Sequence, residues 1–385
     1  MKFDFQNSTY SKLWNSVEGS TILRMLLQNP DLIRSNHTFW KEKFTIDPNV
    51  TPQASDGTAT FKSEMRPLQS SSMMHMRAPL GDTVQRDKQG VKFYTGVIPD
   101  FISDGYREQA MEREYKEQQF QQFGSDALLI MQYAEDVQSR LDSANQTLSN
   151  MAAQIMSKGH IYYNAGQGIQ GAVYKADIPA ANFVKGGTKA WTDPECNLLD
   201  QMRDLEKKFK EDTWGVDIAL QWEIPYDMWH NVFLKNKQVR EWTLENRKLN
   251  KEVVISDMVV TETMVRQYLS QFEGLSPIVV IEEKQSNEGT TIHGWSQNIA
   301  VLRPQGYAGV IRHTTILDER LYSKYGSKLI DRVFASSLDG LVTVENLKID
   351  NGNLCEWQMH AMMSAIPSLD EFLYHVIVDT TQADE

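Results

Sequence analysis

The longest hydrophobic pattern in the chain lies between Ser125 and Gly159. Its apolar residues recur at steps of three or four, which places them on one face of a helix. They are Leu128, Met131, Ala134, Val137, Leu141, Ala144, Leu148, Met151 and Ile155. Ser125 is a favourable N-cap, and Lys158-Gly159 is a typical helix end. The pattern therefore predicts one amphipathic helix over about 125–158, which would be about 45 Å long.

A second organised stretch runs from Trp191 to Glu241 and predicts a helix, a short strand and another helix. Thr192 or Asp193 can cap a helix whose first turn holds Pro194, and Gly215 would end it. Residues 216–222 are apolar enough for a short buried strand, after which Pro225 begins the second helix. The inward positions of the two helices are Leu198, Leu199, Met202, Leu205 and Phe209, then Met228, Trp229, Val232, Phe233 and Val239. This stretch contains no obvious catalytic group.

Strands and helices alternate through the rest of the chain. The patterns predict strands at 160–164, 172–178, 252–260, 277–282, 298–302 and 371–378, and a helix at 262–272. Residues 104–123 are heavily charged, which is typical of a solvent-facing helix. There is no internal repeat or low-complexity linker, so the fold class is predicted to be α+β.

The first hundred residues do not resemble the start of a compact domain. Residues 1–65 carry scattered aromatic side chains, which would be a liability if exposed on a monomer. The segment is either an arm that packs on a neighbouring subunit or an irregular segment wrapped on its own core. Residues 66–100 predict a long hairpin around an Asp87–Gly90 turn, with the glycine at the positive-φ position. Val91, Phe93 and Val97 alternate with Lys92 and Tyr94, and such a hairpin would be a lid or an arm that reaches a partner.

Composition narrows the class of protein. The 385 residues are 41% hydrophobic, enough for a sizeable core, and the formal charge of −12 argues against a general nucleic-acid or anionic-membrane binder. Two cysteines are too few for a disulfide framework. No apolar run is long enough to cross a bilayer, and the first residues lack the apolar middle of a signal peptide. We therefore expect a soluble protein made in a cytoplasm.

The chemistry-bearing motifs are sparse. Gly166, Gly168 and Gly171 form a literal GxGxxG motif, but the residues after it are strand-like and stop at Pro179. A dinucleotide fingerprint needs a helix that opens from the glycines, so a hairpin turn is favoured over nucleotide binding. The eight histidines are dispersed without metal-ligand spacing. We expect no metal, no cofactor and no enzymatic activity.

The order of these segments resembles the major capsid proteins of tailed bacteriophages, specifically the lambda-like coat protein E group within the Hong Kong 97 fold. Residues 76–99 look like the extended loop of that family, and 125–159 look like its spine helix. The run from Trp191 through Leu198–Arg203 to Val239 looks like its axial-domain signature. Residues 295–309 look like a later strand of the family, and 372–378 like its closing strand.

The resemblance implies a division of the chain. An N-terminal arm would occupy 1–65, the extended β-hairpin loop 66–103, and a peripheral domain with the spine helix 104–185. The axial domain would occupy 186–354, and 355–385 would return as strands between the peripheral and axial domains.

It also implies a function. The chain would be a structural shell subunit that self-assembles into hexamers and pentamers enclosing double-stranded DNA, without sequence-specific contact. The N-terminal region of 65 residues is too short for a large internal scaffolding domain, which implies either a separate scaffolding protein or none detectable in the sequence. A portal and a decoration protein are the other partners that the resemblance implies. Its place would be the virion capsid, assembled in the host cytoplasm. The alternatives are another phage structural protein, such as a decoration or tail subunit, or a nucleotide-binding enzyme that uses the glycine motif.

Three sets of residues carry these expectations. The extended loop would contact other subunits through Met76, Arg77, Pro79, Arg86, Lys88, Lys92 and Tyr94. The arm would do so through Trp14, Phe39, Trp40 and Phe44. The axial framework would consist of Trp191, Asp193, Pro194, Trp229, Trp295, Arg303 and Pro304. Lys88 and Lys92 lie where some relatives form crosslinks, but no acceptor is identifiable and no crosslink is expected.

Overall fold

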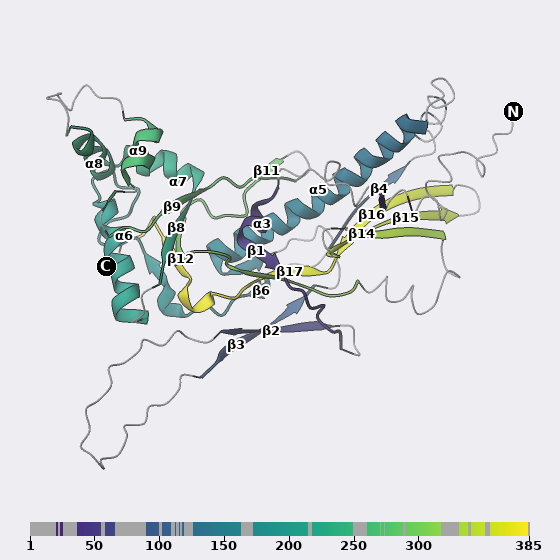
Figure 1. Ribbon diagram of the computed structural model, residues 1–385, viewed down its shortest axis with the longest axis horizontal. Helices are drawn as coiled ribbons and strands as arrows, with labels where there is room; N and C mark the ends of the chain where they lie inside the picture. Colours follow the sequence, from purple (N-terminus) through teal and green to yellow (C-terminus); the bar gives the residue numbers. More distant parts are fainter. Residues whose placement is uncertain are drawn as a thin grey trace, which may run out of the picture.

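The structure is a computed structural model of an elongated molecule that mixes helices and strands, as predicted (Figure 1). It describes residues 21, 24–25, 37–54, 58–65, 90–99, 102–108, 112, 115, 118, 126–162, 172–214, 218–248, 260–269, 271–272, 274–287, 290–316, 331–337, 340–350 and 355–383. The strand expected at 252–260 lies almost wholly outside these residues.

Helix α5 (Asp126–Lys158) confirms the predicted long helix with nearly the expected bounds. Its stripe is buried from Ala134 to Ile155, but Met131 is 57% exposed and Tyr133 takes the inward position there. Tyr133 lies four residues before Val137 and therefore on the same helix face. The last turns are buried on nearly all sides, because α5 passes into the centre of the molecule (Figure 1).

A four-stranded antiparallel sheet packs beside α5 at one end of the molecule. Its order is β14 (Asp331–Ser337), β15 (Val342–Asp350), β16 (Cys355–Met363) and β4 (Ile102–Glu108). The helix predicted for 104–123 is wrong at its start, because β4 pairs with β16 instead. Further along, Glu112, Tyr115 and Gln118 are helical and exposed. The sheet also places 331–350 beside the long helix, apart from the rest of the range 186–354.

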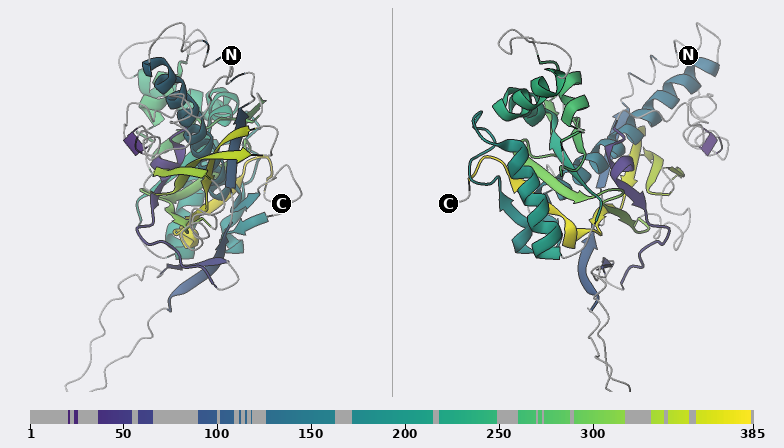
Figure 2. Two further views of the ribbon diagram at one scale, coloured as in Figure 1. Left: turned by 90° about the vertical axis from the view of Figure 1, so that its right-hand side faces the viewer. Right: turned by 60° about the vertical axis from the view of Figure 1, so that its left-hand side comes forward.

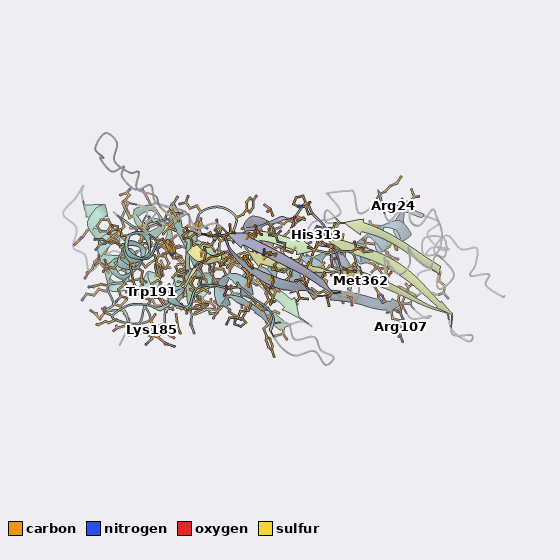
Figure 3. All side chains as sticks on the ribbon, turned by 90° about the horizontal axis from the view of Figure 1, so that it is seen from below. Arg24, Arg107, Lys185, Trp191, His313 and Met362 are labelled. Carbon is orange, nitrogen blue, oxygen red and sulfur yellow. The ribbon has the colours of Figure 1, made fainter. Side chains whose placement is uncertain are left out.

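A five-stranded mixed sheet forms the opposite end, in the order β7 (Phe183–Lys185), β18 (Val376–Asp379), β12 (Ile299–Pro304), β8 (Leu220–Pro225) and β9 (Ile278–Ile281). Four helices accompany it: α6 (Leu198–Lys207), α7 (Tyr226–Asn231), α8 (Lys237–Lys248) and α9 (Glu262–Leu269). Figure 3 shows Trp191 and Lys185 at this end and Arg107 at the other, with His313 between them.

At this end, several helices begin or end at residues other than the predicted ones, and local interactions explain the differences. Asp193 does not cap a helix; its side chain accepts the backbone N–H of Glu195 in a tight turn, and α6 begins later, at Leu198. Helix α6 continues as the π-helix η2 (Lys208–Trp214). The helix predicted from Pro225 onward is two helices, separated by the 3-10 turn η3 (Phe233–Lys235). The predicted inward residues of α6 are buried as expected.

The centre of the molecule is a three-stranded sheet that includes the N-terminal segment. Helix α3 (Phe39–Lys43) leads into β1 (Phe44–Ile46), which pairs in parallel with β13 (Gly309–His313), and β13 pairs antiparallel with β17 (Ala365–Leu369). We call α3–β1 the strap. After β17 the chain forms the 3-10 turn η5 (Phe372–Tyr374) before β18, so the strand predicted over 371–378 is correct only at its end. Another 3-10 turn, η1, spans Ala180–Asn182.

Three two-stranded pairs complete the fold. The hairpin β5 (His160–Tyr162) and β6 (Ala172–Lys175) follows α5, and β10 (Gln285–Asn287) pairs with β11 (Thr290–Ile292). The third pair, β2 (Ala59–Met65) and β3 (Lys92–Ile98), extends from the side of the molecule (Figures 1 and 2). We call it the ribbon. It begins at Ala59, inside the range expected for the arm. No helix among the described residues is long and apolar enough to cross a membrane.

Candidate assembly surface

The inner face of the ribbon is fastened to the subunit. Tyr94 is 7% exposed, and its hydroxyl donates to the backbone carbonyl of Leu369 at 2.5 Å. Its ring meets Phe372 edge-on, with 4.8 Å between ring centroids. Ser63, opposite Tyr94 in the register, donates to the Asp370 carboxylate at 2.5 Å. These contacts fix the base of the ribbon against the turn that follows β17.

Gly96 allows the ribbon to pack this closely. It lies opposite Phe61, and a Cβ at Gly96 would stand 2.4 Å from Cζ of Phe61 and 2.7 Å from Cε2 of Tyr174. The Phe61 ring therefore crosses directly over the glycine and reaches Tyr174, 5.6 Å away between centroids. Any larger residue at position 96 would displace both rings.

The outer face of the ribbon is different in character. Phe93 is 56% exposed and Val97 is 50% exposed. Lys62 lies beside them, with its Nζ 3.9 Å from the Phe93 ring centroid and 3.4 Å from Oε1 of Glu64. Large exposed apolar groups with a cation and a carboxylate nearby are typical of protein–protein contact surfaces.

The alternation predicted for this strand is confirmed, with Phe93 and Val97 on one face and Tyr94 on the other. The sequence pattern did not decide which face packs inward, and in the structure it is the one with Tyr94 and Gly96. The predicted positive φ at Gly90 is wrong, because Gly90 is not among the described glycines with positive φ.

Two of the four aromatic residues expected to reach a neighbour from the arm are buried in their own subunit. Trp40 is 2% exposed and donates through Nε1 to Oδ1 of Asn145 on α5 at 3.0 Å. Phe44 is equally buried, because β1 is the first strand of the central sheet. The prediction of inter-subunit contact is therefore wrong for Trp40, Phe44 and, in the loop set, Tyr94. Of the two interpretations of 1–65, the described strap fits a segment wrapped on its own core.

The other predicted contact residues divide into two groups. Phe39 is half-buried and meets Trp295 edge-on at 6.3 Å between centroids, while Lys92 is exposed at the far end of β3. Trp14, Met76, Arg77, Pro79, Arg86 and Lys88 lie outside the described residues.

The predicted framework residues are mostly buried. Trp191 packs between Trp222 and Phe233, and its Nε1 donates to the carbonyl of Gly186 at 2.5 Å. Trp229, Trp295, Arg303 and Pro304 are also buried, Asp193 is half-buried and Pro194 is exposed. Trp295 belongs to the core around α5 and not to the core of the five-stranded sheet. Gly294 explains this, since a Cβ there would stand 2.6 Å from the Asn150 carbonyl oxygen of α5.

A buried charged cluster joins the strap to the five-stranded sheet. Glu223 on β8 is fully buried, and its Oε1 lies 2.7 Å from Nζ of Lys43 and 3.0 Å from Nη2 of Arg303. Burial alone would raise the pKa of Glu223, but Arg303 and Lys43 hold it below its ordinary value. Sequence reasoning missed Glu223 and Lys43, because residues so far apart in the chain give no local signal; a charged residue inside an apolar strand was the only hint.

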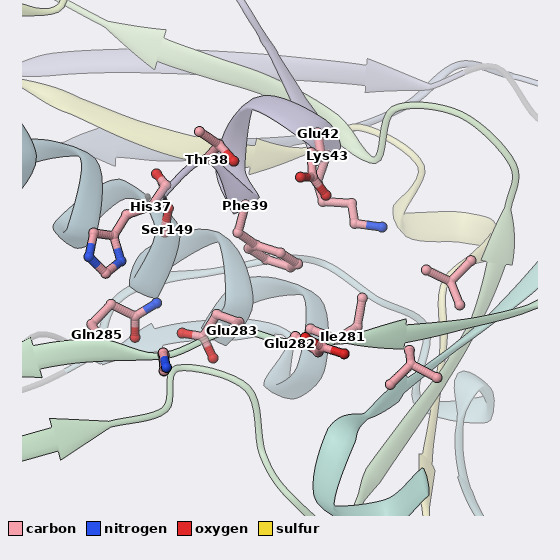
Figure 4. Close-up of a pocket in the computed structure, with 13 residues that line it drawn as sticks. His37, Thr38, Phe39, Glu42, Lys43, Ser149, Ile281, Glu282, Glu283 and Gln285 are labelled. Atoms are coloured by element: carbon pink, nitrogen blue, oxygen red, sulfur yellow. Dashed lines mark hydrogen bonds between the residues drawn. The ribbon is translucent and has the colours of Figure 1, made fainter. Parts of the chain in front are cut away.

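A cavity of about 330 Å³ lies between the strap, α5 and β9 with the segment that follows it (Figure 4). Phe39 and Ile281 provide its apolar wall, and Glu42, Glu282 and His37 provide its polar rim. Among the described residues, no group of three or more His, Cys, Asp or Glu side chains could hold a metal ion. We assign no chemistry to this cavity.

The glycine motif itself, Gly166, Gly168 and Gly171, lies outside the described residues. The flanking segments β5 and β6 are confirmed as strands, and they pair antiparallel. A strand, and not a helix, therefore follows the glycines, so the arrangement lacks the helix N-terminus that holds a dinucleotide pyrophosphate.

Comparison with known proteins identifies the fold. No protein-family model and no curated protein matches the chain. Among solved structures, a protein named as a prophage capsid protein of Escherichia coli CFT073 matches with a TM-score of 0.53 and 13% identity, over 95% of this chain and 98% of that one. A phage-related protein of Bordetella bronchiseptica RB50 gives 0.45 and 14%, over 94% and 96%. The capsid of Myoviridae phage XM1 gives 0.44 and 11%, over 90% and 92%. The chain has a phage capsid protein fold.

Proposed function

We propose that this chain is the major capsid protein of a tailed bacteriophage with the Hong Kong 97 fold. The observation that carries the proposal is the structural similarity to the prophage capsid protein, which spans 95% of this chain and 98% of that one. A fold alone does not determine a function. The exposed outer face of the ribbon supplies independent support, because it is an apolar surface of the kind that a partner would cover.

In this proposal the subunits form hexamers and pentamers of an icosahedral shell. The outer face of the ribbon, with Phe93 and Val97, contacts an adjacent subunit, and Lys92 does so from the far end of β3. The loop residues Met76, Arg77, Pro79, Arg86 and Lys88 and the arm residues Trp14 and Phe39 extend that contact. Tyr94, Trp40 and Phe44 are left out because their own subunit buries them.

The rest of the subunit keeps this surface in position. Helix α5 and the four-stranded sheet form the peripheral domain, now including 331–350, and the five-stranded sheet with its helices forms the axial domain. In this proposal the protein is a structural component of the virion. Its shells assemble in the host cytoplasm and enclose double-stranded DNA. A separate scaffolding protein, a portal and a decoration protein are its proposed partners.

The test is to express the full chain and image it by negative-stain electron microscopy. Closed shells or capsomer rings support the proposal; tubes would favour a tail protein, and a monodisperse monomer at high concentration would contradict a capsid role. Replacing Phe93→Ser with Val97→Ser should abolish the assemblies. Val50→Ser is the matched control, because Val50 is 53% exposed and lies outside the ribbon.

A further inference from the structure

Three parts of the subunit meet at residues 368–372, which we call the junction turn. The ribbon reaches it through the bonds that Tyr94 and Ser63 make to Leu369 and Asp370. The strap reaches it through Ala308, whose N–H donates to the Lys43 carbonyl at 2.7 Å and whose carbonyl accepts the Asp370 N–H at 3.1 Å. A change in the packing of this turn would therefore affect both the ribbon and the strap.

The five-stranded sheet faces the same turn through charged groups. Nη1 of Arg303 on β12 lies 3.7 Å from Oε2 of Glu371, beyond hydrogen-bond range. Arg303 instead donates to Glu223 and to the carbonyls of Pro304 and Gly306. The Glu371 side chain is 26% exposed, but its Oε2 is shielded from solvent and has no hydrogen-bond partner among the described residues.

Other titratable and charged groups lie near Glu371. Asp370 precedes it, with Arg312 of β13 nearby, and Glu223 of β8 lies behind Arg303 with Lys43 of α3. His375 is fully buried, and burial lowers its pKa to about 4. Burial raises the pKa of Glu371 to about 7; Arg303 opposes this shift, and the negative charges of Glu223 and Asp370 add to it.

We propose that the Glu371 carboxyl is a proton-controlled switch in the junction turn that governs how firmly the ribbon is held. The neutral carboxyl allows the turn to stay packed, with the ribbon base fastened to it. The ionised carboxyl needs hydration that the packed turn does not provide, so ionisation favours an opened turn and a loosened ribbon. The switch is a property of the single subunit; only its use in shell assembly rests on the proposed function.

The direction of the effect follows from proton binding. The pKa of Glu371 is about 7 in the packed turn against an ordinary 4.5, so the packed turn holds a proton that the opened turn releases. The packed turn therefore loses stability as pH rises from 4.5 towards 7, and the loss is complete above that. Between pH 6 and pH 8.5 this linkage gives about a tenfold increase in the equilibrium constant for opening.

Hydrogen exchange with mass spectrometry on the isolated full chain tests the switch. After correction for intrinsic exchange rates, opening at 59–65 and 92–98 should increase about tenfold from pH 6 to pH 8.5, with α5 as the internal reference. Glu371→Gln should remove this dependence, with Glu371→Ala as a second variant if the first misfolds. Glu245→Gln, an exposed glutamate on α8, should retain it.

A wild-type ribbon whose corrected exchange does not change with pH would overturn the switch, as would a Glu371→Gln chain that keeps the dependence. The proposed function is tested separately. If the exchange result appears in a chain that forms no shells or rings, the switch stands and the capsid role fails.

Discussion

The two faces of the ribbon show how one pair of strands can be both anchored and available. The inner face is held by specific devices: a hydroxyl donated to a backbone carbonyl, a serine bonded to a carboxylate, and a glycine beneath an aromatic ring. The outer face has fewer apolar residues and leaves two large ones, Phe93 and Val97, uncovered. The difference teaches that an apolar residue in a strand does not by itself indicate the core; the contacts that each face makes with the rest of the subunit decide which face is buried.

The largest effect on stability should come from Phe61→Ala on the inner face. Phe61 is 4% exposed and supports both Tyr174 and the guanidinium of Arg312. Removal of a buried phenylalanine ring costs about 3–5 kcal/mol. Urea denaturation of the isolated chain would measure the loss, and Phe61→Leu should lose much less. A loss below about 1 kcal/mol for the alanine variant would mean that the ribbon is not anchored here.

Gly96→Ala should have the next largest effect. The added methyl group would meet the Phe61 and Tyr174 rings at distances that require both to move, and such overpacking costs about 1–3 kcal/mol. Gly90→Ala is the matched control, since a Cβ there meets nothing within 4 Å. Equal unfolding free energies for the two variants would contradict the close crossing of Phe61 over Gly96.

Tyr94→Phe isolates the hydrogen bond of the inner face. The ring and its contact with Phe372 remain, but the Leu369 carbonyl loses its donor, at a cost of about 1–2 kcal/mol. The same change at Tyr162, which is 46% exposed, should cost little. Faster hydrogen exchange at 92–98 in Tyr94→Phe would accompany the loss, and unchanged exchange there would count against the anchor.

The smallest effect on subunit stability should come from the outer face. The Phe93→Ser, Val97→Ser chain should unfold within about 0.5 kcal/mol of wild type, because solvent already surrounds both side chains. The comparison is sharpest if this same chain fails to assemble. A large loss of unfolding free energy would show that the outer face is buried in the monomer.

Local periodicity predicted much of the fold. Within α5 the apolar residues are only a few positions apart, so the sequence alone shows which face of the helix they share. The same holds for the inward residues of α6. Long-range pairing was less accessible. The sheet in which 331–350 pairs with β16, and β16 with β4, depends on contacts across the chain, and no pattern inside those segments distinguishes it.

The candidate surface was predictable in place but not in detail. The turn residues around Gly90 marked the hairpin, yet the alternation from Val91 to Val97 is equally compatible with either face inward. The phase is decided by Ser368, Leu369 and Phe372, which are far away in sequence. The expected helix start at Asp193 failed for a different reason, since the same side chain serves a tight turn as well as a helix cap.

The position of β18 has a consequence for biosynthesis. This strand lies inside the five-stranded sheet, between β7 and β12, although it follows the sheet's other four strands in the sequence. The sheet therefore cannot close until residues 376–379 have left the ribosome. A nascent chain that has exposed only its earlier segments lacks β18, and its five-stranded sheet is therefore incomplete. Each subunit can complete its fold only after this last strand of the sheet has been synthesised.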